Sequence, residues 1–254
     1  RPPPPPPRPP SRPPAGPARA AGRGAGTPAA GGDARTRAAV ALATASAGTF
    51  GLVDDLAEDT TSRTKGLRGH LGALAQGRVT TGALKILGIS GVSLVAAAIG
   101  TRRTGGAFGH LVDVGVNGAL MAGTANLLNL LDLRPGRALK AAGAASLPYL
   151  GTAAAPTTGA VLGAAVAAAP GDLGERDMLG DCGANALGAA LGSQVAFTAP
   201  RPVRWLALAG VVGLTLASEK VSFSKVIAGH DALRRGLSWG GRPRAARGGG
   251  GAAP

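Results

Sequence analysis

The chain has 254 residues, of which 45% are hydrophobic and only 16% are charged, and its formal net charge is +14. Soluble domains carry about 25% charged residues, so this composition argues against an ordinary soluble protein. The single cysteine, Cys182, excludes an internal disulfide framework. The positive charge does not predict nucleic-acid binding, because much of it lies in the two tails and the chain lacks a row of aromatic residues on which bases could stack.

The two ends of the chain differ in composition from its middle. Residues 1–35 are rich in Pro, Arg, Gly and Ala, and residues 241–254 form a second, basic tail. Neither stretch has a periodic apolar face, so we expect both to be disordered. Residues 36–240 form the predicted transmembrane domain. Because the sequence begins with Arg1 rather than Met, we expect further chain upstream.

Uncharged apolar runs divide the middle of the chain into seven predicted helices. They cover about residues 37–53, 79–100, 108–131, 138–152, 156–170, 183–199 and 203–218. A helix needs about 20 mostly apolar residues to cross a bilayer, and several runs approach that length. Gly and Ala dominate them, which is typical of helices that pack closely in lipid. The predicted fold class is therefore all-α, a polytopic transmembrane helical bundle. A soluble Ala-rich bundle is the alternative, because the mean hydropathy is only +0.18.

The segments between these helices alternate in charge. An excess of Lys and Arg marks the cytoplasmic side of a membrane protein. One alternate set contains most of the basic residues and is assigned to the cytoplasm, which predicts a multi-pass protein of the cell membrane. Its members include Arg63, Lys65, Arg68, Arg78, Arg134, Arg137, Lys140 and Arg176, whereas the other set holds Arg102, Arg103, Arg201 and Arg204.

The residues capable of chemistry gather on the same predicted side as these cytoplasmic segments. They form three clusters at helix ends: Asp54 and Asp55 close the first helix, Asn126, Asn129 and Asp132 close the third, and Asp181 opens the sixth. Hard oxygen ligands of this kind suit Mg²⁺, which takes one or two carboxylates together with phosphate oxygens and water. The spacing of three places Asn126 and Asn129 on one helix face.

Each cluster also has an ordinary structural interpretation. Asp54 and Asp55 could end a helix at the headgroup level, and Asn126 and Asn129 could join helices through hydrogen bonds. Asp181 could cap the helix that follows it. These interpretations explain the clusters one by one but leave their common side of the membrane unexplained.

The three clusters, taken in order, resemble the motifs of the polyprenyl-phosphate N-acetylhexosamine-1-phosphate transferase superfamily, the MraY/WecA-like enzymes. The first motif is Gly-Leu-Val-Asp54-Asp55, followed by Lys-Gly-Leu-Arg-Gly-His70 and Thr-Thr-Gly-Ala-Leu-Lys85. The second is Asn126-x-x-Asn129-x-x-Asp132, and the third is Gly180-Asp181-x-Gly183. The resemblance covers about residues 40–230.

This resemblance implies the transfer of N-acetylhexosamine-1-phosphate, or MurNAc-peptide-1-phosphate, from a UDP-sugar to polyprenyl phosphate, with release of UMP. The reaction would belong to the synthesis of cell-envelope glycan or peptidoglycan precursors. The implied partners are a UDP-activated amino sugar, polyprenyl phosphate and membrane lipid, and the Gly-rich helix faces permit a homodimer. The implied roles are Asp181 as Mg²⁺ ligand, Asp54 and Asp55 beside the diphosphate or lipid phosphate, Lys85 on a phosphate, and Asn126, Asn129 and Asp132 around the nucleotide.

Two departures from the family pattern keep a second function open. The family continues its second motif with another acid, where this chain has Pro135, and its His-rich loop is represented only by His230. The alternative is therefore a catalytically impaired relative that acts as a membrane scaffold or lipid-carrier-binding protein. The retained acids favour the enzyme.

Overall fold

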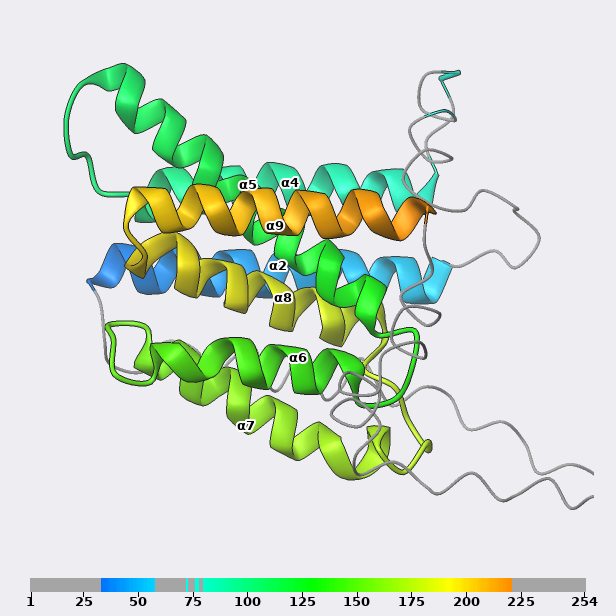
Figure 1. Ribbon diagram of the computed structural model, residues 1–254. Helices are drawn as coiled ribbons and strands as arrows, with labels where there is room; N and C mark the ends of the chain where they lie inside the picture. Colours follow the sequence, from blue (N-terminus) through cyan, green and yellow to red (C-terminus); the bar gives the residue numbers. More distant parts are fainter. Residues whose placement is uncertain (1–32, 58–71, 73–75, 78–79, 221–254) are drawn as a thin grey trace, which may run out of the picture.

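The computed structural model describes residues 33–57, 72, 76–77 and 80–220 (Figure 1). Within these residues the ordered elements are seven α-helices and one short 3-10 helix, with no strand. They are α2 (Ala34–Ala57), α4 (Thr81–Gly100), α5 (Ala107–Leu131), α6 (Arg137–Ser146), η1 (Leu147–Tyr149), α7 (Ala155–Asp172), α8 (Gly180–Thr198) and α9 (Arg201–Lys220). The predicted all-α class is confirmed, whereas both predicted tails lie almost entirely outside the described residues.

Several helix boundaries differ from the sequence prediction: α2 ends at Ala57 instead of residue 53, so that Asp54 and Asp55 lie in its last two turns, and α8 begins at Gly180 instead of residue 183. Two further differences have a local reason. Helix α2 begins at Ala34 instead of residue 37, because the Asp33 carboxylate accepts hydrogen bonds from the backbone N–H and the hydroxyl of Thr36, at 2.8 Å each. Such a cap satisfies amides that have no partner inside the helix. Helix α6 ends at Ser146 instead of residue 152, and Pro148, which has no N–H to donate, lies in the η1 turn that follows.

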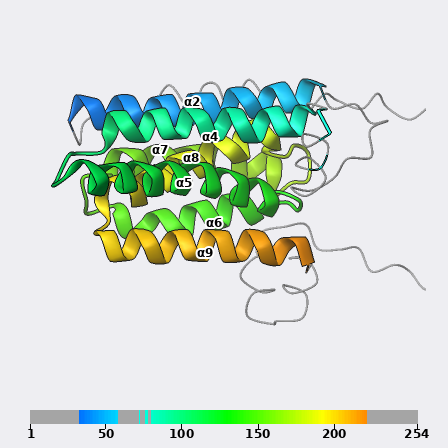
Figure 2. The same cartoon turned by 90° about the horizontal axis from the view of Figure 1, so that it is seen from above.

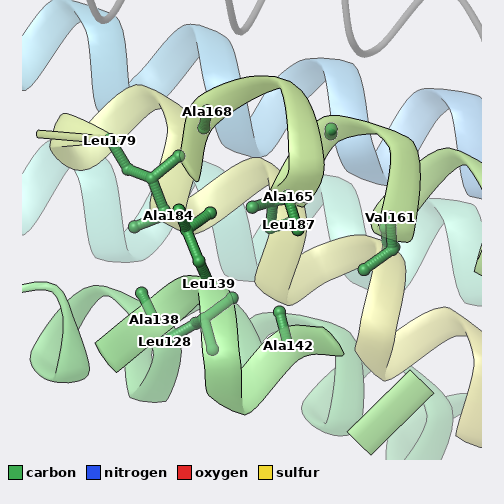
Figure 3. Close-up of a cluster of buried hydrophobic side chains, with 12 residues drawn as sticks. Leu128, Ala138, Leu139, Ala142, Val161, Ala165, Ala168, Leu179, Ala184 and Leu187 are labelled. Carbon is green, nitrogen blue, oxygen red and sulfur yellow. The ribbon is translucent and has the colours of Figure 1, made fainter. Parts of the chain in front are cut away.

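The helices lie side by side, and consecutive helices run in opposite directions (Figures 1 and 2). Helix α8 is the centre of the bundle: it packs against α2 on one side and α5 on the other, and almost all of its residues are buried. Helix α4 covers α2 and α5, α9 packs along α5, and α6 and α7 form a hairpin beside α8. Leu139, Val161 and Leu187 belong to the apolar cluster that joins this hairpin to α8 (Figure 3).

Glycines allow α8 to approach its neighbours at backbone distance. A Cβ atom added at Gly188 would lie 2.5 Å from the Cα of Ala125, and one added at Gly192 would lie 2.6 Å from the carbonyl oxygen of Leu120. Both contacts are to the backbone of α5, which cannot move aside as a flexible side chain can. Small residues at such interfaces are typical of helices packed within membranes.

Three of the helices, α2, α4 and α5, are long and apolar enough to cross a membrane. The outer surface of the bundle is apolar as well. Leu87 on α4 is 52% exposed and Leu206 on α9 is 74% exposed. Side chains of this kind are stable on the outside of a bundle when lipid surrounds it, so the structure supports membrane association.

The tight α5–α8 contact generates a test of the packing. Gly188→Ala should destabilise the protein by about 1–3 kcal/mol, because an added methyl group in a fully packed interface forces backbone shifts. Gly213→Ala on α9 is the matched control, since a Cβ atom there meets nothing within 4 Å, and it should leave stability unchanged or slightly higher. Thermal unfolding of the two purified variants in detergent measures the difference. Equal midpoints would contradict the close packing of α8 on α5.

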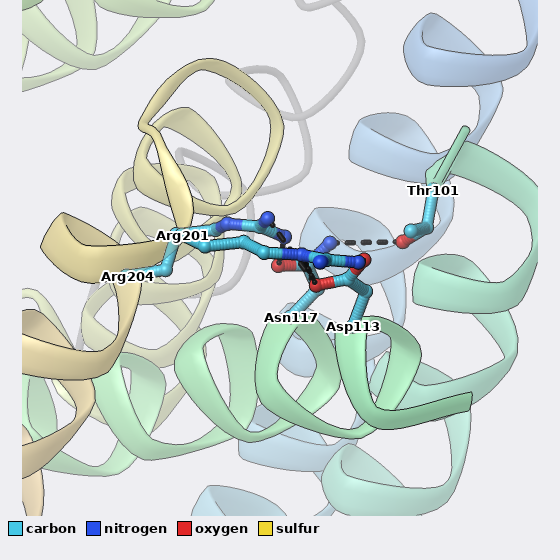
Figure 4. Close-up of polar contacts among 5 residues, drawn as sticks. All are labelled: Thr101, Asp113, Asn117, Arg201 and Arg204. Atoms are coloured by element: carbon cyan, nitrogen blue, oxygen red, sulfur yellow. Dashed lines mark hydrogen bonds and ion pairs between the residues drawn. The ribbon is translucent and has the colours of Figure 1, made fainter. Parts of the chain in front are cut away.

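A group of charged and polar residues joins α9 to α5 at the end of the bundle where α9 begins (Figure 4). The buried carboxylate of Asp113 accepts hydrogen bonds from Nη2 of Arg201 at 2.6 Å and from Nη2 of Arg204 at 3.3 Å. Arg204 also donates to Asn117, whose side-chain amide donates to Thr101 at 2.9 Å. Because Asp113 is only 5% exposed, its charge is compensated mainly by the two guanidinium groups.

Removing the Asp113 charge should therefore loosen α9. Asp113→Asn leaves Arg204 buried without its counter-charge, and breaking such a pair should cost about 3–5 kcal/mol of stability. The comparison is Asp33→Asn, which removes the acid of an ion pair to the largely exposed Arg102 and should change stability much less. Thermal unfolding in detergent compares the two variants. An equal loss of stability in both would show that the burial of the Asp113 ion pairs does not add to their contribution.

Candidate functional site

The four helix ends that carry predicted site residues, on α2, α4, α5 and α8, meet at one end of the bundle (Figure 1). Helices α2 and α5 finish there, and α4, α6 and α8 begin there, because consecutive helices run in opposite directions. The three motifs, although far apart in the sequence, therefore share one end of the bundle. His70, the other basic residues between α2 and α4 and His230 lie outside the described residues.

Lys85 connects the first and third motifs directly. Its Nζ atom lies 2.6 Å from Oδ2 of Asp54 and donates a second hydrogen bond to Oδ2 of Asp181. The three side chains are 14%, 17% and 29% exposed, in the order Lys85, Asp54 and Asp181. One ammonium group thus holds two carboxylates in a partly buried position, where the ion pairs are screened less than they would be at the surface.

Asp55 has a different role from its neighbour. Its carboxylate accepts hydrogen bonds from the backbone N–H groups of Asp181, at 3.2 Å, and Cys182, at 3.1 Å. The first amides of a helix have no intrahelical partner, so Asp55 caps α8 from a different helix. This capping fixes the backbone that carries Asp181, and the structure gives Asp55 a positioning role.

Two glycines make this cap sterically possible. A Cβ atom at Gly51 would lie 2.4 Å from the carbonyl oxygen of Asp181, so only glycine lets α2 pass the start of α8. Gly180 has φ +67°, in the left-handed region that favours glycine. The spacing of Gly51 before the paired acids and of Gly180 before Asp181 is thus explained by packing and backbone geometry.

The second motif lies at the end of α5. Asn126 and Asn129 are half-buried, and neither side chain makes a hydrogen bond with another described residue. Their amides are therefore available to a bound molecule. Asp132, one residue beyond α5, is 5% exposed, and its Oδ1 atom has no partner among the described residues.

The environment of Asp132 favours its neutral form. Burial raises the pKa of this carboxyl from 3.8 to about 8, the negative charge of Asp172 adds to the rise, and a hydrogen bond from the backbone of Gly180 opposes it. Asp181 and Asp55 contribute further repulsion. The motif therefore ends in a carboxyl group that can donate a hydrogen bond near neutral pH.

Asp172, the last residue of α7, is a site residue that sequence reasoning missed. It is 2% exposed, its Oδ2 atom accepts a hydrogen bond from the backbone N–H of Gly136 at 3.0 Å, and its Oδ1 atom has no partner among the described residues. The one signal in the sequence was an acid directly after the long uncharged run of residues 141–171, which by itself indicates only a helix end.

Mg²⁺ is the metal ion that oxygen ligands of this kind suit. No three His, Cys, Asp or Glu side chains of the described chain converge so as to hold a metal ion. Mg²⁺ is commonly held by only one or two carboxylates together with substrate phosphates and water. Asp54 and Asp181 fit that smaller donor set, because both reach the same cation, the Lys85 ammonium.

Two pockets among the described residues lie away from the candidate site. One of about 200 Å³ is lined by Arg37, Arg102 and Gln194, and one of about 160 Å³ by Arg102, Asn117 and Arg204. Both lie at the opposite end of the bundle, so neither is the predicted nucleotide pocket of Asn126, Asn129 and Asp132.

The raised pKa of Asp132 generates a pH prediction. Between about pH 4 and pH 8 the folded protein holds a proton on Asp132 that the unfolded chain has lost, so Asp132 makes stability fall as pH rises through that window. Asp132→Asn should remove this dependence and raise stability at pH 8 by roughly 1–3 kcal/mol.

Thermal unfolding of the wild type and the variant in detergent, followed from pH 5 to about 8.5, tests this. The control is Glu175→Gln, which changes an exposed acid on the loop after α7. A wild type and an Asp132→Asn variant with the same pH dependence would show that Asp132 titrates in its ordinary range.

Comparison with known proteins adds no relative: the chain matches no protein-family model, no curated protein and no solved structure.

Proposed function

We propose that the protein is a membrane phosphosugar transferase, which moves N-acetylhexosamine-1-phosphate or MurNAc-peptide-1-phosphate from a UDP-sugar to polyprenyl phosphate. The observation that carries the proposal is the contact of Lys85 with both Asp54 and Asp181. It joins two of the three motifs at one end of a helical bundle, together with the half-buried amides of Asn126 and Asn129.

The chemistry requires two anionic substrates to meet. An oxygen of the lipid phosphate attacks the sugar-linked phosphorus of the UDP-sugar, a new P–O bond forms, and the P–O bond to UMP breaks with its electron pair leaving on UMP. Lys85 would contact a phosphate and offset the repulsion, and Asp54 would organise the charge beside it. Bound Mg²⁺, held by Asp181 with Asp54 nearby, would supply further neutralisation of the phosphate oxygens.

The remaining residues hold the nucleotide and the geometry. Asn126 and Asn129 would offer hydrogen bonds to the nucleotide, and neutral Asp132 would donate one without repelling it. Asp55 would keep Asp181 in place by capping α8. The acceptor's polyprenyl tail is soluble only in lipid, so a site at the end of apolar helices lies where its phosphate group is presented.

The proposed membrane arrangement is a multi-pass protein with about seven helices and the site on the cytoplasmic side. The basic residues of the connections at the site end support this orientation. Helix α6 has only 10 residues, fewer than the roughly 17 that a crossing requires. With η1 it would enter the bilayer only partway, beside α7.

A non-catalytic relative is the second candidate, in which the same fold serves as a scaffold or binds the lipid carrier. Lys85 pairs with both Asp54 and Asp181, and Pro135 stands where the family has a second acid. A site in this condition could bind a lipid phosphate without transferring a sugar.

A transfer assay separates the two candidates. The protein in detergent is given Mg²⁺, polyprenyl phosphate and radiolabelled UDP-N-acetylhexosamines, and lipid-linked sugar and UMP are measured. We expect turnover in the wild type and a loss of at least about 100-fold in Asp181→Asn, because a carboxylate ligand to a metal ion is removed.

Asp33→Asn at the opposite end of the bundle is the matched control and should retain activity. Absence of turnover in the wild type, with an active transferase assayed alongside, would leave the non-catalytic candidate. Full activity in Asp181→Asn would remove Asp181 from the metal site.

A further inference from the structure

One ammonium group contacts both carboxylates that are proposed to lie beside the metal ion. Nζ of Lys85 lies 2.6 Å from Oδ2 of Asp54 and donates a hydrogen bond to Oδ2 of Asp181. A carboxylate oxygen that is occupied by an ammonium group is closed to a metal ion, and the two positive charges also repel each other. Lys85 and a divalent cation therefore compete for the same pair of acids.

The acids are held in place, whereas the lysine side chain can change its partners. Asp181 stands at the start of α8, where Asp55 accepts hydrogen bonds from the backbone. Lys85 lies near the start of α4, which is capped by the hydroxyl of Thr80 as it accepts a hydrogen bond from the N–H of Ala83 at 3.1 Å. A lysine ammonium ends a flexible four-carbon chain and donates in three directions, so it can move to another acceptor while α4 stays where it is.

The charges of these side chains disfavour either change made alone. Departure of the Lys85 ammonium would leave two neighbouring carboxylates, 17% and 29% exposed, without a counter-charge. Arrival of a divalent cation would place it against the ammonium. A diphosphate that arrives with the cation removes both costs, because the ammonium can move onto a phosphate oxygen while the cation takes the acids. Uptake of the cation and uptake of the diphosphate should therefore depend on each other.

We propose that Lys85 is a tethered counter-ion that keeps divalent cations off Asp54 and Asp181 until a diphosphate draws its ammonium away, so that metal ion and diphosphate bind cooperatively. That the diphosphate belongs to a UDP-sugar rests on the proposed function, whereas the competition between Lys85 and a divalent cation does not. A coupling of this kind typically changes each affinity by about 5- to 150-fold, equally in both directions.

Binding of Mn²⁺ without any nucleotide tests the competition. Mn²⁺ takes the same oxygen ligands as Mg²⁺, and the free ion can be measured by its EPR signal. With the full-length protein in detergent, Lys85→Met should bind Mn²⁺ at least about tenfold more tightly than the wild type. Lys85→Arg keeps the positive charge and should bind Mn²⁺ as weakly as the wild type. An affinity of Lys85→Met that is no higher than that of the wild type would overturn the proposal.

Further variants separate this competition from a general effect of charge. Lys140→Met removes the same charge from α6, which begins at the same end of the bundle, and should leave the Mn²⁺ affinity unchanged; a gain equal to that of Lys85→Met would overturn the proposal. Adding Asp181→Asn to Lys85→Met should abolish the tight binding, and binding that persists would place the ion elsewhere and overturn it too. If Lys85→Met does not fold, Lys85→Gln decides in its place, with the same expected gain.

Addition of UDP tests the exchange of partners. At equal concentrations of free Mn²⁺, saturating UDP should raise the Mn²⁺ affinity of the wild type about tenfold and that of Lys85→Met much less. UDP that binds without raising the wild-type affinity, or that raises both affinities equally, would overturn the exchange. If UDP does not bind while Lys85→Met still gains Mn²⁺ affinity, the competition stands and the proposed function fails. Sugar transfer by the wild type with no gain in Lys85→Met would leave the function and remove the competition.

Discussion

The start of α8 is the constraint on which the rest of this structure depends. The helix is buried along almost its whole length between α2 and α5, so its first amides have to be satisfied within the protein. Asp55 of α2 supplies the acceptors, and Gly51 lets the two backbones come close enough. Asp181 is consequently fixed beside Asp54, and Lys85 bridges the two. The contacts that satisfy the first amides of α8 are therefore the same contacts that bring the residues of the candidate site together.

Charge is distributed differently at the two ends of the bundle. At the site end, Lys85 bridges two partly buried acids, and Asp132 adds a carboxyl whose raised pKa lets it stay neutral. At the opposite end, Asp113 is saturated by two arginines and an asparagine completes the network. The proposed function assigns a cation and a phosphate to the first end, whereas the second attaches α9 to α5.

The order and approximate limits of the helices could be predicted from the sequence, because uncharged Gly- and Ala-rich runs are long and are interrupted by charged or Pro-containing segments. The common end for Asp54, Asp132 and Asp181 also followed, since consecutive helices have to alternate in direction. The partners of these residues could not be predicted. Neither the capping of α8 by Asp55 nor the bond from Gly136 to Asp172 leaves a local pattern, because each joins segments distant in the sequence. Helix α6 is shorter than its apolar run because Pro148, in the η1 turn, follows directly after its end.

Asp55 and the amides that it caps are separated by 126 and 127 positions along the chain. During synthesis α2 therefore emerges with two acids that have no partner until α4 brings Lys85 and, much later, α8 arrives. Uncompensated carboxylates are costly within a bilayer, so in the proposed membrane arrangement the end of α2 would have to stay close to water while the intervening helices are inserted. The candidate site is thus completed late in biogenesis, and a chain arrested before α8 would carry Asp54 and Asp55 without forming the site.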